Sequence, residues 1–185
     1  MSLRYLPFVA VLGCHHEADA PAPPPVVMIE VRDATSVIAS VRPDRPCRAS
    51  VGPIEMIVGK DPFVSDLGET HWTGSAYGSG MFFLENDLKV ARLAPEAGDH
   101  ATIFDQTGEV IVQVDAGAGS ATVTNGAGRL VRTLTRRGDA IAATAPPVTI
   151  TGTQDFVLAA LISAQELEPE IRMLAACDRV LRKEP

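Results

Sequence analysis

The segment from Leu84 to Thr144 repeats one short pattern three times, and this repeat restricts the fold more than any other feature of the chain. Each copy joins a hydrophobic run to a Gly-led return run, and the copies are about 20 residues apart, which is the length of two short strands with their turns. The outgoing runs are 87–93, 108–114 and 128–134, and the return runs are 98–104, 119–124 and 138–143. The repeat therefore predicts an antiparallel meander.

Turn residues separate these runs. The stretches Asp105–Gly108 and Asn125–Gly128 join Asp or Asn to Gly between hydrophobic runs, a composition that favours hairpins. Earlier in the chain, β-branched runs predict four further strands, at 26–32, 36–41, 47–51 and 54–59. The segment 65–80 is the least regular, and we predict a loop there.

The end of the chain changes from strand to helix. Residues Thr151–Asp155 offer helix caps, and Phe156–Ile162 is apolar all round, which is typical of a buried helix. Pro169 then suits the first position of a second helix. We predict a mainly β (α+β) fold, an antiparallel meander or open barrel, with a C-terminal helical hairpin over 154–166 and 169–182 packed on or in it.

Composition sets the number of domains and limits the partners. The chain has 185 residues, of which 46% are hydrophobic and 21% charged, so one globular domain over 26–185 is expected. Its net charge is −7, and no run of Lys and Arg exceeds two residues. Binding to nucleic acid is not expected from such a charge pattern.

The N-terminal residues are typical of an exported chain. Arg4 precedes a short apolar run that leads to Val11-Leu12-Gly13-Cys14, a motif that resembles the lipobox of bacterial lipoproteins. The resemblance implies a signal peptide over 1–13, acylation of Cys14 and attachment to a membrane. The alternative is a cytosolic start with a buried Cys14.

Residues 14–25 follow as a Pro-rich tether. Lipoproteins with Asp directly after the acylated Cys tend to stay in the inner membrane, whereas this chain has His15 there. The resemblance therefore implies the periplasmic face of the outer membrane. Adjacent His15 and His16 on a flexible segment do not make a fixed metal site.

Acylation of Cys14 would leave Cys47 and Cys177, and an exported compartment is oxidising. The two thiols either form a disulfide or stay reduced and buried. The sequence alone leaves both alternatives open.

The predicted loop carries the only Trp, and binding residues concentrate on loops. His71, Trp72 and Tyr77 are therefore candidate ligand residues. More often, however, a lone Trp such as Trp72 is a packing anchor that holds its loop to the core.

No catalytic, metal or cofactor site is predicted. The chain lacks Gly-x-Ser-x-Gly, a phosphate-binding Gly-rich loop and Cys-x-x-Cys. Neighbouring Asp99 and His100 could orient one another. The only cluster that merits inspection is Asp66, Glu69, His71 and His100.

Three functions follow as hypotheses. The first is a lipid-anchored envelope protein that acts as a non-catalytic binding or assembly module. The second is a carrier of an apolar ligand inside a barrel, which requires a cavity lined by strands and by Phe156–Ile162. The third is a hydrolase that uses His71 or His100.

Two further resemblances concern the domain. The spacing of Asp105 to Val114 and of Asn125 to Leu134 is similar to bacterial YD/RHS repeats, with Phe104 and Thr124 in place of the family's Tyr. The series of hairpins that ends in an apolar helix with Ala175–Leu181 is similar to tubby-like barrels, including their LURP-one and scramblase-like relatives. In that family a final helix threads the barrel, so the resemblance implies helices inside the sheet.

Overall fold

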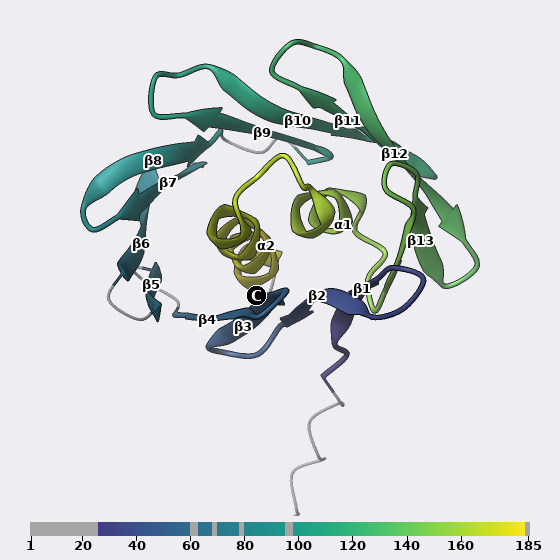
Figure 1. Ribbon diagram of the computed structural model, residues 1–185, viewed down its shortest axis with the longest axis horizontal. Helices are drawn as coiled ribbons and strands as arrows, with labels where there is room; N and C mark the ends of the chain where they lie inside the picture. Colours follow the sequence, from purple (N-terminus) through teal and green to yellow (C-terminus); the bar gives the residue numbers. More distant parts are fainter. Residues whose placement is uncertain (1–25, 60–62, 68–69, 78–79, 95–97, 184–185) are drawn as a thin grey trace, which may run out of the picture.

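A computed structural model of the chain describes residues 26–59, 63–67, 70–77, 80–94 and 98–183, without the side chains of 63–71, 74–80 and 183. The predicted signal peptide and tether, with Cys14, lie outside the described residues. Fourteen antiparallel strands form one sheet, in the order β4-β3-β2-β1-β14-β13-β12-β11-β10-β9-β8-β7-β6-β5. The sheet curls into an open barrel around two helices, so that its end strands β4 and β5 come near each other (Figure 1). The mainly β fold with a C-terminal helical hairpin is thus confirmed.

The strands of the first half are β1 (Ile29–Arg32), β2 (Val37–Arg42), β3 (Cys47–Val51), β4 (Ile54–Val58), β5 (Phe63–Leu67), β6 (Thr70–Tyr77) and β7 (Gly80–Glu85). Those of the second half are β8 (Leu88–Leu93), β9 (His100–Asp105), β10 (Val110–Ala116), β11 (Ser120–Asn125), β12 (Leu130–Arg137), β13 (Ala140–Ala143) and β14 (Val148–Thr151). The helices are α1 (Phe156–Ser163) and α2 (Pro169–Lys183).

Each copy of the sequence repeat forms one β-hairpin of the sheet. Strands β8, β10 and β12 coincide with the predicted outgoing runs, and β9, β11 and β13 with the return runs. Equivalent residues face inward in successive hairpins, since Ile103 and Val123 are 20 positions apart and both fully buried. The hairpins therefore present the same face to the interior.

The predicted loop over 65–80 is wrong. These residues continue the sheet as part of β5, all of β6 and the start of β7, and Thr73 pairs with Leu84 across β6 and β7. The segment is rich in Gly, Ser and Thr, which local propensity assigns to loops. Backbone pairing with β7 on one side and β5 on the other overrides that propensity.

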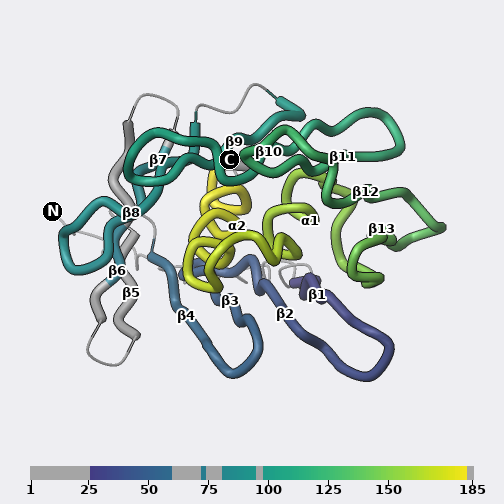
Figure 2. The backbone as a smooth tube through the Cα atoms, turned by 45° about the horizontal axis from the view of Figure 1, so that its top comes forward, coloured from purple at the N-terminus to yellow at the C-terminus, as the bar shows by residue number. Residues whose placement is uncertain are grey.

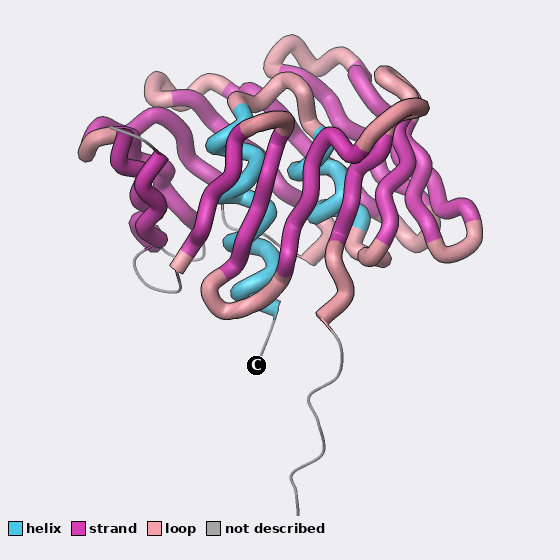
Figure 3. The backbone as a smooth tube through the Cα atoms, turned by 60° about the horizontal axis from the view of Figure 1, so that its bottom comes forward, coloured by secondary structure: helices cyan, strands magenta, loops and turns pink. Residues whose placement is uncertain are grey.

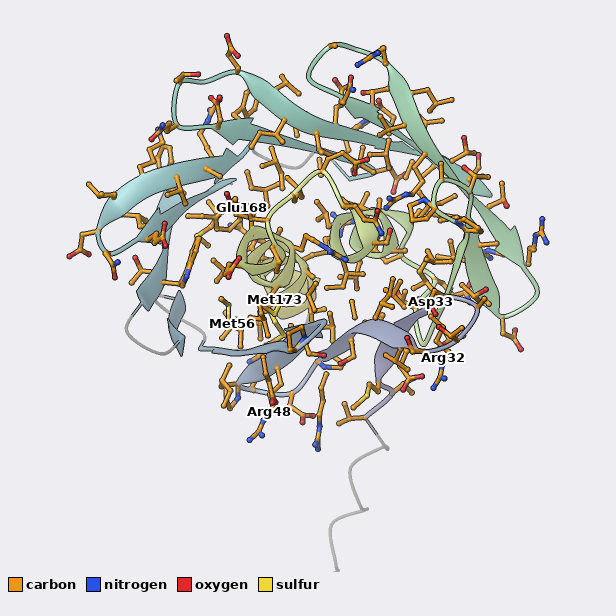
Figure 4. The ribbon with its side chains drawn as sticks, in the orientation of Figure 1. Arg32, Asp33, Arg48, Met56, Glu168 and Met173 are labelled. Carbon is orange, nitrogen blue, oxygen red and sulfur yellow. A yellow bond between two sulfur atoms is a disulfide. The ribbon has the colours of Figure 1, made fainter. Side chains whose placement is uncertain are left out.

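Both helices fill the interior of the barrel. Every residue of α1 is buried, and the two helices lie side by side inside the curved sheet (Figure 2). Met56 of β4 and Met173 of α2 point into this interior, whereas Arg48 of β3 points outward (Figure 4). Within the described part of the chain, neither helix has the length and apolar composition needed to span a membrane.

The alternating strand directions give the barrel two different ends (Figure 3). We call the end that carries residues 26–28 and the last turn of α2 the proximal end. The opposite end, which we call the distal end, carries the turns that follow β1, β3, β7, β9, β11 and β13, together with the connection between α1 and α2. The distal end also carries a pocket with several acidic lining residues.

Candidate binding site at the distal end

A pocket of about 320 Å³ opens at the distal end, between the hairpin turns and the connection of the two helices. Strands β7 to β10 form one wall, and the helix connection with the start of α2 forms the other. The lining residues are Glu85, Val90, Asp105, Gln106, Ile111, Glu166, Leu167, Glu168 and Ile171. Four of these carry carboxylates, so the pocket favours a cationic group over an anion.

The turn after β9 fixes the Asp105 carboxylate. Its Oδ1 accepts hydrogen bonds from the backbone nitrogens of Thr107 and Glu109 at 2.8 and 2.9 Å, and from the Thr107 hydroxyl at 2.7 Å. These bonds, that of the Thr107 hydroxyl first, lower the pKa of Asp105. Asp105 therefore remains charged at neutral pH.

Glu85 and the helix connection complete the acidic wall. Glu85 is the last residue of β7 and precedes a two-residue turn in which Asn86 and Asp87 have φ of 48° and 66°. Such left-handed pairs reverse a hairpin tightly, which holds Glu85 at the rim. Glu166 and Glu168 reach the pocket because α1 ends at Ser163 and α2 restarts at Pro169.

Two buried arginines stand behind the pocket. The Nε and Nη2 of Arg172 donate to the Ile162 carbonyl at 3.0 and 2.6 Å. Arg132 donates from Nη1 to the Ser163 carbonyl and from Nε to the Ala145 carbonyl, the latter at 3.2 Å. Both guanidinium groups thus satisfy the carbonyls at the C-terminal end of α1, where the helix dipole favours cations.

Burial dominates the electrostatics of this pair. Desolvation, followed by repulsion from Arg132, lowers the pKa of Arg172 to about 10, while Glu166 raises it. Burial likewise lowers the pKa of Arg132, and Glu166 again opposes the shift. Glu166 therefore acts on both arginines, and both remain cationic at neutral pH.

Two polar atoms near this pocket have no hydrogen-bond partner among the described residues. They are the Oε2 of Glu166 and the Nη2 of Arg132, both buried. A buried, unpaired polar atom is costly, so such atoms are suited to a polar group from outside. The described residues contain no group of three His, Cys, Asp or Glu side chains that could hold a metal ion.

The three residues of the predicted ligand loop belong to strand β6 instead. Trp72 is 3% exposed and contributes to the hydrophobic core, which agrees with the packing-anchor alternative. The backbones of His71 and Tyr77 are placed in the strand, and their side chains lie outside the described part. Trp72, whose side chain is described, does not line the distal pocket.

The predicted cluster of Asp66, Glu69, His71 and His100 does not come together in the fold. Asp66 and His71 pair across β5 and β6, whereas His100 starts β9, three strands from β6. At about 4.8 Å per strand this is a separation of roughly 14 Å. Glu69 lies outside the described residues.

The partner of His100 is Asp115 and not Asp99, the sequence neighbour that was predicted to orient it. Its Nδ1 lies 2.6 Å from Oδ1 of Asp115 on β10, and Asp99 is not its partner. Both side chains are exposed, at 60% and 39%. A solvated pair on the surface lacks the enclosed cleft that a hydrolase site needs.

The disulfide alternative is confirmed. Cys47, the first residue of β3, is bonded to Cys177 of α2, and both residues are fully buried. The bridge fastens the helical hairpin to the sheet near the proximal end.

Local sequence patterns do not directly indicate the buried arginines Arg132 and Arg172. A repeat-based signal existed, because Arg132 occupies the inward position that Val112 holds one repeat earlier, 20 residues before. A charged residue at a core position of a repeat requires a special partner. That partner, the end of α1, could not be known from the repeat alone.

The fold and the pocket define a class of structure: an antiparallel β-meander barrel closed around its own helical hairpin. Comparison with family models, curated proteins and solved structures found no match to the chain.

Proposed function

We propose that this protein is a lipid-anchored envelope protein in which Cys14 carries the anchor and the barrel is a non-catalytic binding or assembly module. The observation that supports this proposal best is the Cys47–Cys177 disulfide. Disulfides persist in oxidising compartments and are rare in the cytosol, which agrees with export. The bridge also leaves Cys14, in its lipobox-like setting, as the only remaining cysteine of the sequence.

The barrel interior favours a structural or binding role over the carriage of an apolar ligand. All eight residues of α1 are buried against the sheet and α2, so the protein's own side chains occupy the space that a carrier would need. The distal pocket is rimmed by carboxylates and contains none of Phe156–Ile162. An apolar ligand gains little from burial beside such groups.

Processing at Cys14 tests the anchor. Globomycin, which blocks the lipoprotein signal peptidase, is expected to cause accumulation of a precursor longer by residues 1–13. Mass spectrometry of the untreated protein should find an acylated Cys14 at the mature N-terminus. A Cys14→Ser variant should leave the membrane fraction. Retention of Met1 on the mature protein, or membrane partition of the Cys14→Ser protein, would contradict the proposal.

The membrane of destination can be tested with a single substitution. His15→Asp places after the acylated Cys the residue that favours inner-membrane retention in the lipoproteins that the motif resembles. We expect the unmodified protein in the outer-membrane fraction of a density gradient and the His15→Asp protein in the inner-membrane fraction. His16→Asp is the matched control and should not move the protein.

A further inference from the structure

The two ends of the barrel differ in charge. The carboxylates of the distal end, among the described residues, are Asp33, Glu55, Glu85, Asp87, Asp105, Glu109, Glu166, Glu168 and Glu170. The cations there are Arg32, Lys89, Arg129 and the buried Arg132 and Arg172. At the proximal end the positive and negative charges of the described residues are nearly balanced. The cations are Arg42, Arg45, Arg48, Arg92, Arg136, Arg137, Arg179 and Arg182, and the carboxylates are Glu30, Asp44, Asp99, Asp115, Asp139, Asp155 and Asp178. Among the described residues, the excess of negative charge thus lies at the distal end.

The proximal end also presents apolar side chains where the described chain begins. Val26, Val27 and Met28 are 50%, 60% and 45% exposed. They directly follow residue 25, where the proposed lipid tether ends. Exposed apolar residues beside a lipid anchor can enter the interfacial region of a bilayer.

The tether by itself does not orient the domain. Its residues 14–25 span at most about 40 Å even when fully extended, whereas the ends of a seven-residue strand such as β10 are about 20 Å apart. A spacer of this reach allows the barrel to stand on either end or to lie on its side. The orientation must therefore come from the surfaces.

We propose, on the basis of the proposed acylation of Cys14, that the barrel stands with its proximal end on an anionic lipid surface and its acidic distal end away from it. Anionic lipids give the membrane a negative surface potential, which repels the distal carboxylates. The potential decays within a Debye length of about 8–10 Å, shorter than the barrel, so only the end that faces the lipid experiences it fully. This orientation leaves the distal pocket open to the aqueous side.

Two matched alanines allow a direct test. Ala127 lies in the distal turn after β11 and Ala118 in the proximal turn after β10, and both are exposed. A dye is attached through Ala127→Cys or Ala118→Cys to the acylated full-length mature protein, in phosphatidylglycerol vesicles that carry a headgroup quencher. Because the two ends are about 20 Å apart, we expect the Ala118→Cys dye to be quenched roughly threefold more strongly.

Charge variants identify the cause. Gln106→Lys, Glu109→Lys and Glu168→Lys together, all at exposed distal positions, should abolish the difference in quenching. The control variant, Asp99→Lys with Asp139→Lys at the proximal end, should preserve or enlarge it. Equal quenching of the two dyes on the unmodified acylated protein would overturn this proposal and leave the anchor intact. Failure to find acylated Cys14 would instead overturn the proposed function.

Discussion

At the scale of single residues, the repeat tolerates different side chains at equivalent positions when each finds its own partners. Asp105 and Asn125 begin equivalent turns, and each accepts hydrogen bonds from the backbone two and four residues later. Arg132 replaces an inward Val and is stabilised by the Ser163 carbonyl at the end of α1 and by the Ala145 carbonyl. At other positions a side chain larger than that of glycine is unfavourable, because the backbone of a neighbouring segment lies too close.

Gly126 is such a position. A Cβ on Gly126 would collide with the backbone carbonyl oxygen of Val110, whereas one on Gly119 would meet nothing within 4 Å. We expect Gly126→Ala to lower the free energy of unfolding by about 1–3 kcal/mol, because backbone must move. Gly119→Ala should change it by less than about 0.5 kcal/mol. Urea unfolding followed by Trp72 fluorescence measures both, and equal values would contradict the expectation.

Burial of Asp178 determines whether its contribution to the free energy of unfolding rises or falls with pH. It is 1% exposed, and burial raises its pKa, although hydrogen bonds from Arg182 at 2.8 and 2.9 Å oppose the shift. A carboxyl whose pKa is raised in the fold favours its protonated form there. Its contribution to stability is therefore full below the unfolded pKa, near 4, and is lost as pH rises through the folded pKa.

Denaturation at a series of pH values tests this expectation. The free energy of unfolding of the unmodified protein, minus that of Asp178→Asn, should decrease as pH rises from about 3 toward neutrality. The control Gly119→Ala, which removes no titrating group, should give a nearly constant difference. If this difference in unfolding free energy increases with pH for Asp178→Asn, the pKa of Asp178 is not raised in the fold and the expectation is contradicted.

At the scale of elements, α1 depends on one residue at its start. Asp155 caps the helix by accepting from the backbone nitrogens of Val157 and Leu158 at 3.0 and 3.2 Å. The same carboxylate pairs with Arg179 of α2 at 2.8 Å, and Arg179 also donates to the Gly98 carbonyl. The Asp155–Arg179 pair thus joins the two helices and the turn before β9.

Two substitutions of Asp155 separate its role as the helix cap of α1 from its charge interaction with Arg179. Asp155→Ala removes both and leaves Arg179 buried without this carboxylate, so we expect a loss of about 3–5 kcal/mol in the free energy of unfolding. Asp155→Asn keeps a capping oxygen and should cost less. Calorimetry or urea unfolding would show the order, and equal losses for the two variants would count against a separate role for the charge.

At the scale of the whole molecule, two long-range connections complete the barrel. Strand β1 pairs with β14, so the first and last strands of the chain are neighbours in the sheet. The Cys47–Cys177 bridge joins residues 130 positions apart and fastens α2 inside the ring. Without the pairing of β1 with β14, strands β1–β4 and strands β5–β14 would form two separate sheets.

Removal of the bridge should destabilise the domain strongly. The chain-entropy relation gives about 5 kcal/mol for a loop of this length, so Cys47→Ala with Cys177→Ala should shift urea unfolding to much lower concentration. Reduction of the unmodified protein should give a similar shift, and Cys14→Ser should give none. An unchanged unfolding midpoint in the double variant would refute the stabilising role.

The local pattern of the sequence was sufficient to predict the meander, its turns and the helical hairpin. Alternation, Gly-containing turns, the apolar run Phe156–Ile162 and the break at Pro169 all act over a few residues, and such patterns can be read without a partner. The sequence could not decide whether Cys47 and Cys177 are bonded or reduced, and the structure shows that they form a disulfide.

Only the tertiary structure decided the features that depend on distant residues. Strands β5 and β6 form because their neighbours pair with them, although their composition favours a loop. The position of Arg132 and Arg172 at the end of α1, and the acidic pocket before them, arise when the helices enter the sheet. Local propensity contains no information on which chain segment approaches which, because pairing and burial energies belong to contacts between residues far apart in the sequence.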